Sequence, residues 1–357
     1  MTSSGVRQDD SPDSALLAAS TVSSDEDTPI ALSVVIVTYN EEAAVERCLE
    51  SVFRACRDVP GFEVILVDSN STDGTVARAL EFPITIFRIS DDDLTTPSAG
   101  RYVGTKHARG ERILFVDGDM CISESWLSDA LARLGGDVVA VDGHLNTPAA
   151  DDQIRDVDAV RGVALYDAAA LREVGGFDPT LRALEDIELG YRLTAAGYRL
   201  CRLPSVAATH FYEDKLSEPF RRWRFGYYFG FGQVLRKSTS RPRIFIKFLR
   251  RGCYTLGMLG WLAVGLATVL FPTAFVLWVA SSVVLFVAVV SQLGVHRATI
   301  FWLANLLGAV GLVVSLVHPD LRDDEFSFDV VERLQTASIH SSTALDQASS
   351  HVTDQNE

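Results

Sequence analysis

Acidic residues are absent from positions 219–319, although 47 of the 357 residues of the chain are Asp or Glu. Within this stretch, residues 252–296 also lack Lys and Arg, and a further apolar run occupies 298–317. A membrane-spanning helix needs roughly 20 apolar residues. The first run is therefore long enough for two helices, with Pro272 at the turn, and the second run for one. A buried soluble helical domain is the alternative, but three long runs nearly free of charge favour a membrane domain of about three helices.

Residues 219–251, which we call the basic belt, hold ten of the 32 basic residues, interleaved with aromatic side chains. Such a pattern also suits nucleic acid. Its position next to an apolar run favours anionic lipid head groups or the phosphate of a lipid carrier, so no nucleic-acid partner is expected. By the positive-inside rule the belt lies on the cytoplasmic side, and His296–Arg297 agrees as an inner loop. We therefore expect a multi-pass cell-membrane protein with its preceding domain in the cytoplasm.

The remaining composition concerns the source and the tails. The formal charge is -15, and by count the basic residues are 28 Arg and 4 Lys. This balance is typical of a salt-adapted surface and predicts a halophilic source, with an acidic protein from a GC-rich genome as the alternative. Residues 1–30 carry no apolar signal-peptide core and are expected to be disordered. The acidic segment 318–357 is expected to be disordered and to lie outside the cell. Five cysteines without metal-ligand spacing indicate free thiols.

Residues 31–218 alternate apolar runs with helix-like segments, the pattern of an α/β domain with a mainly parallel sheet and flanking helices. The strands are expected at 31–37, 63–67, 84–89, 112–116 and 138–141. The segment after the first strand has apolar residues at helical spacing, and Asn40 is its expected N-cap.

Two aspartates, Asp117 and Asp119, directly follow the apolar strand "ILFV" with one glycine between them. Ligands bind outside the carboxyl ends of strands in open parallel sheets. Two like charges at such a point require a compensating partner. A divalent cation, Mg²⁺ or Mn²⁺, would remove the repulsion and could hold a diphosphate. The same spacing occurs elsewhere in this acid-rich chain, so an acidic loop is the alternative.

Further polar residues end the first two strands: Thr38, Tyr39 and Glu41 follow the first, and Asp68 the second. A carboxylate can accept the ring N–H of a nucleobase, and a tyrosine ring can stack on the base. Taken singly, each residue is equally a helix cap or a turn. Together, at successive strand ends, they predict a nucleotide pocket.

The segments "VVIVTYNEE", "VDSNSTDGT", "PSAGRYVGTKHARGERILFVDGDM", "VGGFDPTL" and "LEDIELGYRL" resemble, in order and spacing, the family 2 inverting glycosyltransferases of the GT-A fold. The resemblance covers residues 32 to about 210. It implies nucleoside contacts from Thr38, Tyr39, Glu41 and Asp68, a nucleotide contact from Arg101, and a ribose or metal contact from Asp117. It further implies that Asp119 binds the metal with help from His210. Finally, it implies a sugar or acceptor site at Gly175, Gly176, Phe177 and Glu185, and a catalytic base at Asp186.

Several alternatives stay open for these roles. Asp186 is equally an acid at the N-terminus of a helix, with Glu185 and Glu188 as substitutes for the base. A single histidine such as His210 is often structural.

The chain departs from the family pattern in two places. The second motif reads "DSNS", with Asp68 as its only carboxylate, which bears on base selectivity. Processive polysaccharide synthases carry Q-x-x-R-W where this chain reads "PFRRW", with Pro219 in place of the glutamine. The resemblance therefore favours the addition of a single sugar over processive synthesis.

The chemistry of glycosyl transfer agrees with this pattern. The transition state is oxocarbenium-like, and the leaving nucleoside diphosphate is an anion that a metal can stabilise. A base must remove the proton of the acceptor hydroxyl. We expect an enzyme that moves one hexose or hexuronic acid from a UDP- or GDP-sugar to a lipid-linked, dolichol-phosphate type glycan at the cytoplasmic membrane face. In a halophilic archaeon this reaction would serve N-glycosylation of the surface-layer glycoprotein.

Three other functions remain open on the sequence. A polyprenyl-phosphate sugar synthase would use the phosphate itself as acceptor, and an exopolysaccharide glycosyltransferase would use a different glycan. A non-catalytic membrane protein that binds a nucleotide sugar is the third.

Overall fold

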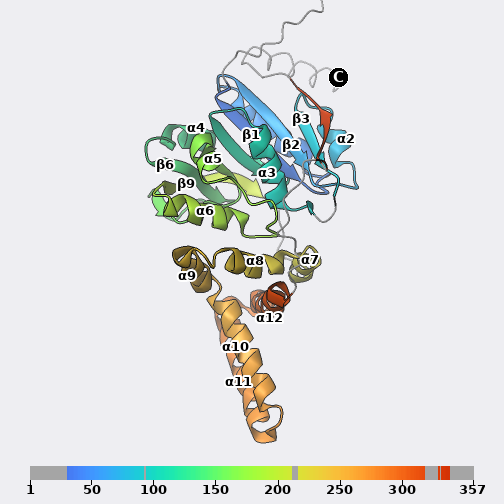
Figure 1. Cartoon of the computed structure of the whole chain (residues 1–357), viewed down its shortest axis with the longest axis vertical. Coiled ribbons are helices and arrows are strands. Elements are labelled where there is room, and N and C mark those ends of the chain that lie inside the picture. Colours follow the sequence, from blue (N-terminus) through green and yellow to red (C-terminus); the bar gives the residue numbers. More distant parts are fainter. Residues whose placement is uncertain (1–29, 92–93, 211–215, 318–328, 330, 338–357) are drawn as a thin grey trace, which may run out of the picture.

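The computed structural model describes residues 30–91, 94–210, 216–317, 329 and 331–337. An α/β domain occupies one end of the molecule, a layer of short helices lies next to it, and an apolar helical hairpin extends from that layer (Figure 1). Residues 1–29 and most of 318–357, the two tails that we expect to be disordered, lie outside the described residues.

The α/β domain is built on a mixed sheet with the strand order β10-β3-β2-β1-β4-β8-β6-β9-β5, and β7 pairs with β9. The five expected strands are confirmed as β1 (Leu32–Thr38), β2 (Phe62–Asp68), β3 (Thr85–Ile89), β4 (Arg112–Asp117) and β6 (Val138–Leu145). The others are β5 (Met120–Ile122), β7 (Arg155–Val157), β8 (Ala164–Asp167), β9 (Arg199–His210) and β10 (Val331–Gln335). The segment β3-β2-β1-β4 is parallel, whereas β8 runs antiparallel to both β4 and β6. The expected mainly parallel sheet is therefore parallel in this segment and mixed beyond β4.

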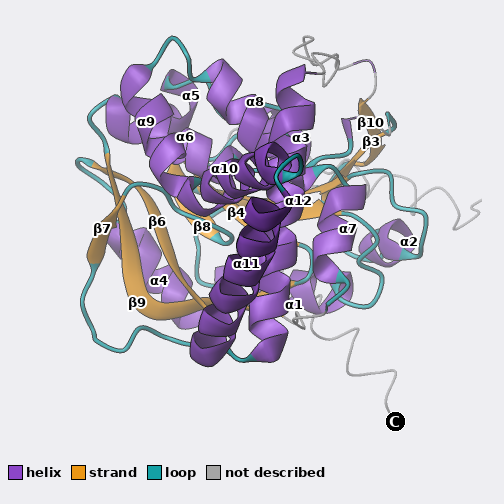
Figure 2. Ribbon diagram, turned by 90° about the horizontal axis from the view of Figure 1, so that it is seen from below, coloured by secondary structure: helices purple, strands orange, loops and turns teal. Residues whose placement is uncertain are grey.

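Strand β1 is buried on both faces, which explains its uninterrupted apolar sequence. Val34 and Ile36 belong to the core cluster on one face, and Val35 and Val37 to the cluster on the other. Helices α1 (Val45–Cys56), α2 (Thr75–Ala79) and α4 (Glu124–Arg133) cover the first face. Helices α3 (Pro97–His107), α5 (Ala168–Glu173) and α6 (Glu185–Ala195) cover the second. Figure 2 shows the two helical layers on opposite sides of the strands.

The register of the parallel strands brings their polar ends together. Thr38 of β1 pairs with Asp68 of β2, and Val37 pairs with Asp117 of β4. The polar residues that follow these strands therefore share one edge of the sheet, as in other open α/β folds.

The basic belt forms the helical layer next to this domain. Its elements are α7 (Glu218–Arg224), a 3₁₀ turn η3 (Tyr227–Phe229), α8 (Gly230–Lys237) and α9 (Pro242–Arg251). A third apolar cluster joins α6 of the domain to α8 and α9, with Ile187, Val234 and Phe248 among its buried members. The belt is thus packed onto the α/β domain rather than separated from it by a linker.

Three apolar helices follow: α10 (Cys253–Thr268), α11 (Pro272–Leu293) and α12 (Val295–Val317). Helix α11 begins at Pro272, where the sequence predicts the turn. By length and composition α11 and α12 are candidate membrane spans, and α10 is shorter, with 16 residues. At 1.5 Å per residue α10 is about 24 Å long. Helices α10 and α11 form the hairpin in Figure 1, and α12 is seen nearly end-on at its base.

Part of the C-terminal segment belongs to the sheet, so the prediction of disorder over 318–357 is wrong for residues 331–335. Strand β10 pairs antiparallel with β3, with Val331 opposite Ile89 and Arg333 opposite Phe87 (Figure 2). The Gln335 side chain also donates to the carbonyl oxygens of Phe82 and Ile84. The physical reason is that β3 would otherwise be an edge strand with unpaired backbone groups.

Candidate active site

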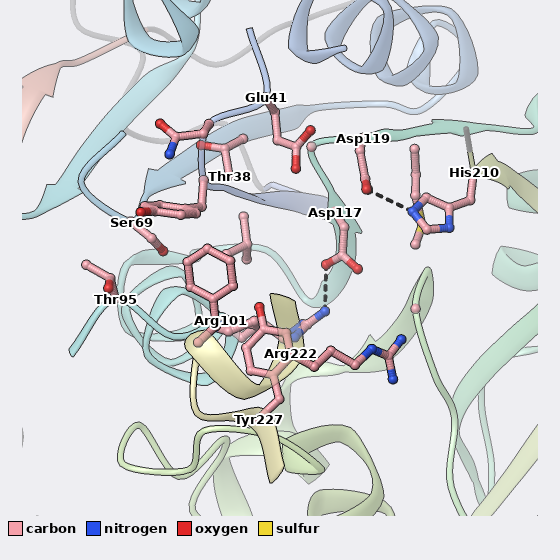
Figure 3. Close-up of a pocket in the computed structure, with 18 of the residues that line it drawn as sticks. Thr38, Glu41, Ser69, Thr95, Arg101, Asp117, Asp119, His210, Arg222 and Tyr227 are labelled. Atoms are coloured by element: carbon pink, nitrogen blue, oxygen red, sulfur yellow. Dashed lines mark hydrogen bonds and ion pairs between the residues drawn. The ribbon is translucent and has the colours of Figure 1, made fainter. Parts of the chain in front are cut away.

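A cavity of about 700 Å³ lies at the polar edge of the sheet. This volume is in the usual range for small-molecule sites. Its walls come from the end of β1, the β4–β5 turn, the start of α6 and the α7–η3 part of the basic belt (Figure 3). Of the thirteen residues with predicted roles, nine line it: Thr38, Tyr39, Glu41, Arg101, Asp117, Asp119, Glu185, Asp186 and His210.

The turn between β4 and β5 carries the two aspartates. The Asp117 carboxylate accepts from the Arg101 guanidinium at 2.6 Å, and the Asp119 carboxylate lies 2.8 Å from Nε2 of His210. His210 reaches this point because β5 and β9 pair in antiparallel fashion next to the turn. Gly118 separates the acids because a Cβ at this position would collide with the Thr38 side chain. The two aspartates therefore face different partners.

A buried charge cluster lies under the cavity, around Arg101 of α3. The Arg101 guanidinium donates to both Asp117 and Glu185, and Asp186 is its next carboxylate neighbour. One cation thus serves three acids. Burial raises the pKa of Glu185 and of Asp186, and the positive charge of Arg101 opposes that rise. The resemblance implies that Arg101 contacts the nucleotide. In the structure its guanidinium group binds the carboxylates of Asp117 and Glu185.

Replacing Arg101 by Met is expected to destabilise the fold, because the buried Glu185 and the partly exposed Asp117 and Asp186 would lose their shared cation. Removal of one partner of a buried ion pair typically costs about 3–5 kcal/mol. Without Arg101 the folded-state pKa of Glu185 should rise further above its unfolded value, so the folded state binds more protons and stability falls as pH rises. Unfolding midpoints measured in detergent should therefore differ most from the parent at pH 8 and least at pH 5. A pH-independent difference would contradict this account.

Glu41, after the end of β1, is a further carboxyl group in the cavity wall. Burial, and then the Asp119 carboxylate, raise its pKa to about 7, and Arg221 is the main opposing charge. A carboxyl group with this pKa is only partly ionised at neutral pH. A cation bound near Glu41 would therefore favour its ionised form and reduce the repulsion from Asp119.

Thr38, Tyr39 and Ser69 form the part of the cavity wall at the ends of β1 and β2, where the resemblance implies nucleoside contacts. The Tyr39 ring is 39% exposed and meets the Phe225 ring edge-on, with 5.6 Å between the centroids. The predicted ligand Asp68 does not line the cavity, because its carboxylate is fully buried. It accepts from the Ser71 amide at 3.0 Å and pairs with Arg88 at 3.4 Å. In this structure Asp68 holds the loop, and Ser69 occupies the cavity wall.

The predicted sugar residues Gly175, Gly176 and Phe177 also lie outside the cavity lining. The Phe177 ring is buried against Phe115 at a centroid distance of 5.0 Å, because an apolar ring gains more in the core than at a charged wall. The two glycines adopt positive φ of 90° and 69° in the turn after α5. Their role here is to turn the chain toward α6.

The sequence assigned no individual role to the residues from α7 to η3 that complete the cavity, namely Glu218, Arg221, Arg222, Phe225 and Tyr227. Arg221 and Arg222 both donate to the Glu218 carboxylate, at 2.7 and 2.8 Å. The only sequence signal is the "RRW" triplet at the place of the family motif. They reach the cavity because the belt packs onto the α/β domain.

Within the described residues, no three His, Cys, Asp or Glu side chains form a metal-binding group. The predicted trio is divided, because Asp117 pairs with Arg101. Asp119 and His210 remain adjacent, and a carboxylate with an imidazole is a donor set that Mn²⁺ or a similar cation accepts. Burial is the main cause of the raised pKa of Glu41, and the Asp119 carboxylate adds to the rise, so these two acids repel each other at this point. The residues present thus fit a divalent cation with two protein ligands and room for phosphate oxygens.

Comparison with known proteins relates the α/β domain to glycosyltransferases. Residues 33–172 match the family model for glycosyl transferase family 2. Glycosyltransferase AglE of Haloferax volcanii is 24% identical over 201 residues, which cover 50% of this chain and 66% of the relative. The succinoglycan biosynthesis protein ExoA of Rhizobium meliloti is 28% identical over 253 residues, covering 62% of this chain and 74% of the relative. The chain thus spans just under two thirds of the first relative's length.

Among solved structures, the chain is similar to the mannosyltransferase PcManGT of Pyrobaculum calidifontis in complex with GDP-Man and Mn²⁺. The TM-score is 0.56 at 21% identity, over 83% of this chain and 90% of that one. At this identity the likeness shows the fold. The predicted fold class is confirmed: a GT-A-like α/β domain followed by apolar helices, two of which are candidate membrane spans.

Proposed function

We propose that this protein is a membrane-bound glycosyltransferase that moves one sugar from a nucleotide-sugar donor to a lipid-linked glycan of the dolichol-phosphate type. The observation that carries the proposal is the composition of one cavity. Its sheet side holds the carboxylates of Asp117, Asp119 and Asp186, and its other side is the α7–η3 part of the basic belt. A donor bound at the sheet edge would therefore face an acceptor delivered from the apolar helices.

The donor in this proposal is a UDP- or GDP-sugar with a divalent cation. The complex of the structurally similar PcManGT with GDP-Man and Mn²⁺ supports both assignments. Asp119 and His210 would hold the cation, which when bound supplies positive charge to the departing diphosphate. Tyr39 offers a ring at the open side of the cavity, and Thr38 and Ser69 offer hydroxyl groups to the nucleoside.

Asp186 is the proposed base of an inverting reaction. It lies at the start of α6, lines the cavity, and is partly exposed, whereas the preceding Glu185 is buried. The Glu185 carboxylate is held by Arg101, whereas the Asp186 carboxylate accepts its hydrogen bond from the Ile187 amide at 2.7 Å. Asp186 can therefore accept the proton of an acceptor hydroxyl while Glu185 keeps the cluster in place. Glu188 is occupied by Arg192 and is a helix residue.

The acceptor side is assigned to Arg221 and Arg222. Both guanidinium groups line the cavity and are about half exposed. Arginine forks match phosphate geometry. The two residues could thus bind the phosphate of the lipid carrier next to the transferred sugar.

The two guanidinium groups of Arg221 and Arg222 also favour a second candidate function, that of a polyprenyl-phosphate sugar synthase. There the phosphate held by Arg221 and Arg222 would itself attack the donor. A phosphate is already a nucleophilic anion, so this reaction needs no base. Asp186→Asn should then be tolerated far better than Asp119→Asn.

The pathway is proposed from the relatives and the composition. Similarity to a glycosyltransferase of Haloferax volcanii, together with the acidic, lysine-poor surface, supports N-glycosylation of a surface-layer glycoprotein in a halophilic archaeon. Similarity to a succinoglycan biosynthesis protein supports exopolysaccharide synthesis as the alternative. Deletion in the source organism, followed by mass spectrometry of lipid-linked glycans, tests both. Intact lipid-linked glycans in the deletion strain would contradict the first pathway.

The proposed topology places the α/β domain in the cytoplasm and the α10–α11 hairpin in the membrane. Because the belt and β10 both attach to the α/β domain, the chain between them must cross the membrane an even number of times. Helix α12 packs against α7, η3 and α8 as well as the hairpin. We therefore propose that α12 lies along the cytoplasmic face, and that the C-terminal segment is cytoplasmic.

Single-cysteine labelling in a cysteine-free background is expected to separate two topologies. Val269→Cys, at the hairpin turn, should react with a membrane-impermeant maleimide in intact cells, because the turn lies outside. Thr336→Cys, directly after β10, should react only after permeabilisation, as should the belt control Ser240→Cys. Labelling of Thr336→Cys in intact cells would support three spans and an external tail instead.

A further inference from the structure

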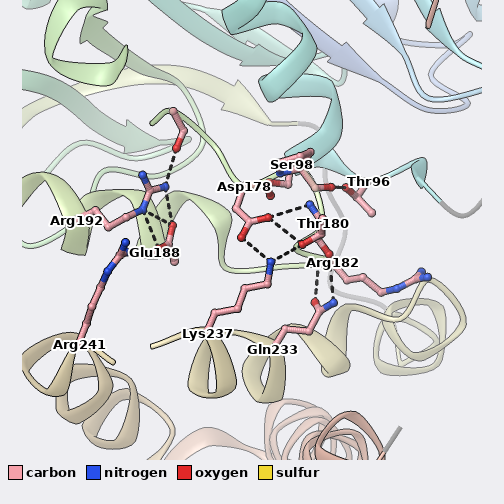
Figure 4. Close-up of polar contacts among 12 residues, drawn as sticks. Thr96, Ser98, Asp178, Thr180, Arg182, Glu188, Arg192, Gln233, Lys237 and Arg241 are labelled. Carbon is pink, nitrogen blue, oxygen red and sulfur yellow. Dashed lines mark hydrogen bonds and ion pairs between the residues drawn. The ribbon is translucent and has the colours of Figure 1, made fainter. Parts of the chain in front are cut away.

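The loop that leads to the catalytic acids, residues 178–184, is held on one side by α8 of the basic belt (Figure 4). Lys237 Nζ donates to Oδ2 of Asp178 at 2.7 Å and to the Thr180 hydroxyl at 2.6 Å. The Gln233 side chain accepts from the Arg182 amide at 3.0 Å and donates to the Thr180 carbonyl at 3.1 Å. Gln233 is 1% exposed, so its two hydrogen bonds to the loop are shielded from solvent.

The same loop is held on its other side by α3. The Ser98 hydroxyl donates to the Asp178 carbonyl, and the Thr96 hydroxyl lies 3.5 Å from the Pro179 carbonyl oxygen. The loop is therefore fixed between a helix of the α/β domain and a helix of the belt. Because α3 also carries Arg101, this side of the loop is fixed relative to the charge cluster.

The end of the loop has an unusual backbone. Leu184, directly before Glu185 and Asp186, has a φ of 66°, a region that side chains with a Cβ rarely adopt. Such conformations persist where the surrounding structure determines them, and they concentrate at functional sites. Helix α8 packs closely against this part of the loop. Gly230 of α8 lies so near Ala183 that a Cβ on Gly230 would be only 2.8 Å from the Ala183 carbonyl oxygen. This turn sets the direction in which the two acids leave the loop.

Helix α8 is in turn fixed to the apolar segment. Arg236 donates to the Ser315 carbonyl of α12 at 2.7 Å, and Gly232 packs directly on the Ser315 side chain. Consecutive contacts thus run from α12 through α8 and the loop to Glu185 and Asp186.

We infer that Gln233 and Lys237 are positioning residues for the transfer reaction: from the membrane-proximal belt, they hold residues 178–184 so that Asp186 faces the acceptor. This inference rests on the proposed function. Neither side chain lines the cavity, so neither touches the donor directly. The belt therefore has two roles, one at the acceptor and one in shaping the catalytic loop.

The test uses the full-length protein in membranes and measures kcat and the donor KM separately. Lys237→Gln and Gln233→Ala are each expected to lower kcat about ten-fold, because small displacements of a catalytic group have large effects on rate. The donor KM and the concentration of Mn²⁺ for half-maximal rate should stay unchanged, and Lys237→Arg should restore most of the rate. The matched control is Lys247→Gln, because Lys247 also joins the belt to the α/β domain, through Asp158 at 2.8 Å, but not to the loop.

The possible outcomes separate the inference from the function. Full kcat in Lys237→Gln and Gln233→Ala, with an active parent, would overturn the inference alone. An equal loss in Lys247→Gln, or parallel losses in rate, donor affinity and unfolding midpoint without rescue by Lys237→Arg, would also overturn it in favour of general structural weakening. An inactive parent protein, tested with UDP- and GDP-sugars and membranes, would contradict the proposed function itself.

Discussion

Replacing Asp186 by Asn is expected to lower kcat by about 10²–10⁴-fold, the usual contribution of a general base. Asparagine keeps the shape of the side chain and can still approach the Ile187 amide through its oxygen, but it cannot take a proton from the acceptor. The donor KM should change little, because the substitution leaves the metal and nucleoside contacts in place. Turnover of a labelled nucleotide sugar with isolated membranes measures both constants.

The pH dependence offers an independent check on the same residue. Burial raises the pKa of Asp186 above its ordinary 3.8, and Arg101 opposes the rise. As pH falls, Asp186 takes up a proton at a higher pH than an exposed aspartate, so the parent enzyme should lose kcat/KM on the acid side. Residual activity in Asp186→Asn should lack this acid limb.

The matched control for Asp186→Asn is Glu188→Gln. Glu188 lies two residues after Asp186 on α6, does not line the cavity, and pairs with Arg192. The control variant is expected to retain the parent kcat and acid limb. A nearly normal rate in Asp186→Asn would contradict hydroxyl activation and support a phosphate acceptor, provided that Asp119→Asn is impaired.

The fold was largely predictable because its signals are local. A strand such as β1, buried on both faces, needs an unbroken apolar run, and the run is visible in the sequence. Strand β10 carried no such signal: its sequence, "VERLQ", is mostly polar, and its burial pattern shows largely exposed residues. It forms because β3 offers an unpaired edge, which is a property of the folded sheet.

The candidate site was predictable to the extent that strand ends determine position. Asp117 and Asp119 follow β4 directly and reach the cavity as a consequence of the register. The hydrogen-bond partners of these side chains could not be predicted from the sequence. Asn40, the expected N-cap, instead has a φ of 55° and accepts from the Thr72 amide at 2.8 Å, while α1 begins at Val45. It joins the loops after β1 and β2, a contact 32 residues apart in the chain.

The contacts between the belt and the α/β domain could not be predicted from the sequence, because they join residues that are far apart in the chain. Charge and position predicted a membrane-facing segment, but Lys237 and Gln233 contact the loop 178–184, more than 50 residues away in the chain. In the sequence, a lysine of a basic segment looks the same whether it faces lipid or an aspartate of the α/β domain. Only the docking of α8 on the domain distinguishes the two cases.

Replacing Asp119 by Asn is expected to lower kcat by about 10²–10³-fold, through the loss of charge stabilisation at the leaving group. An amide is a weaker cation ligand than a carboxylate, and the neighbouring His210 would lose the partner that raises its pKa. Unlike Asp186→Asn, this variant should also require a higher Mn²⁺ or Mg²⁺ concentration for half-maximal rate. Titration of each metal after EDTA treatment, at saturating donor, measures the difference.

Asp58→Asn serves as the control for Asp119→Asn, because it removes an equal charge from a side chain that is 91% exposed on the surface. Both its kcat and its metal requirement should match the parent. The two catalytic variants then give distinct results: Asp186→Asn loses rate at unchanged metal dependence, and Asp119→Asn loses both. Undiminished turnover in EDTA, with normal donor binding in Asp119→Asn, would remove the cation from this site. The negative charge around Glu41 would then have to be neutralised by the basic belt, where the charge of Arg221 opposes the raised pKa of Glu41.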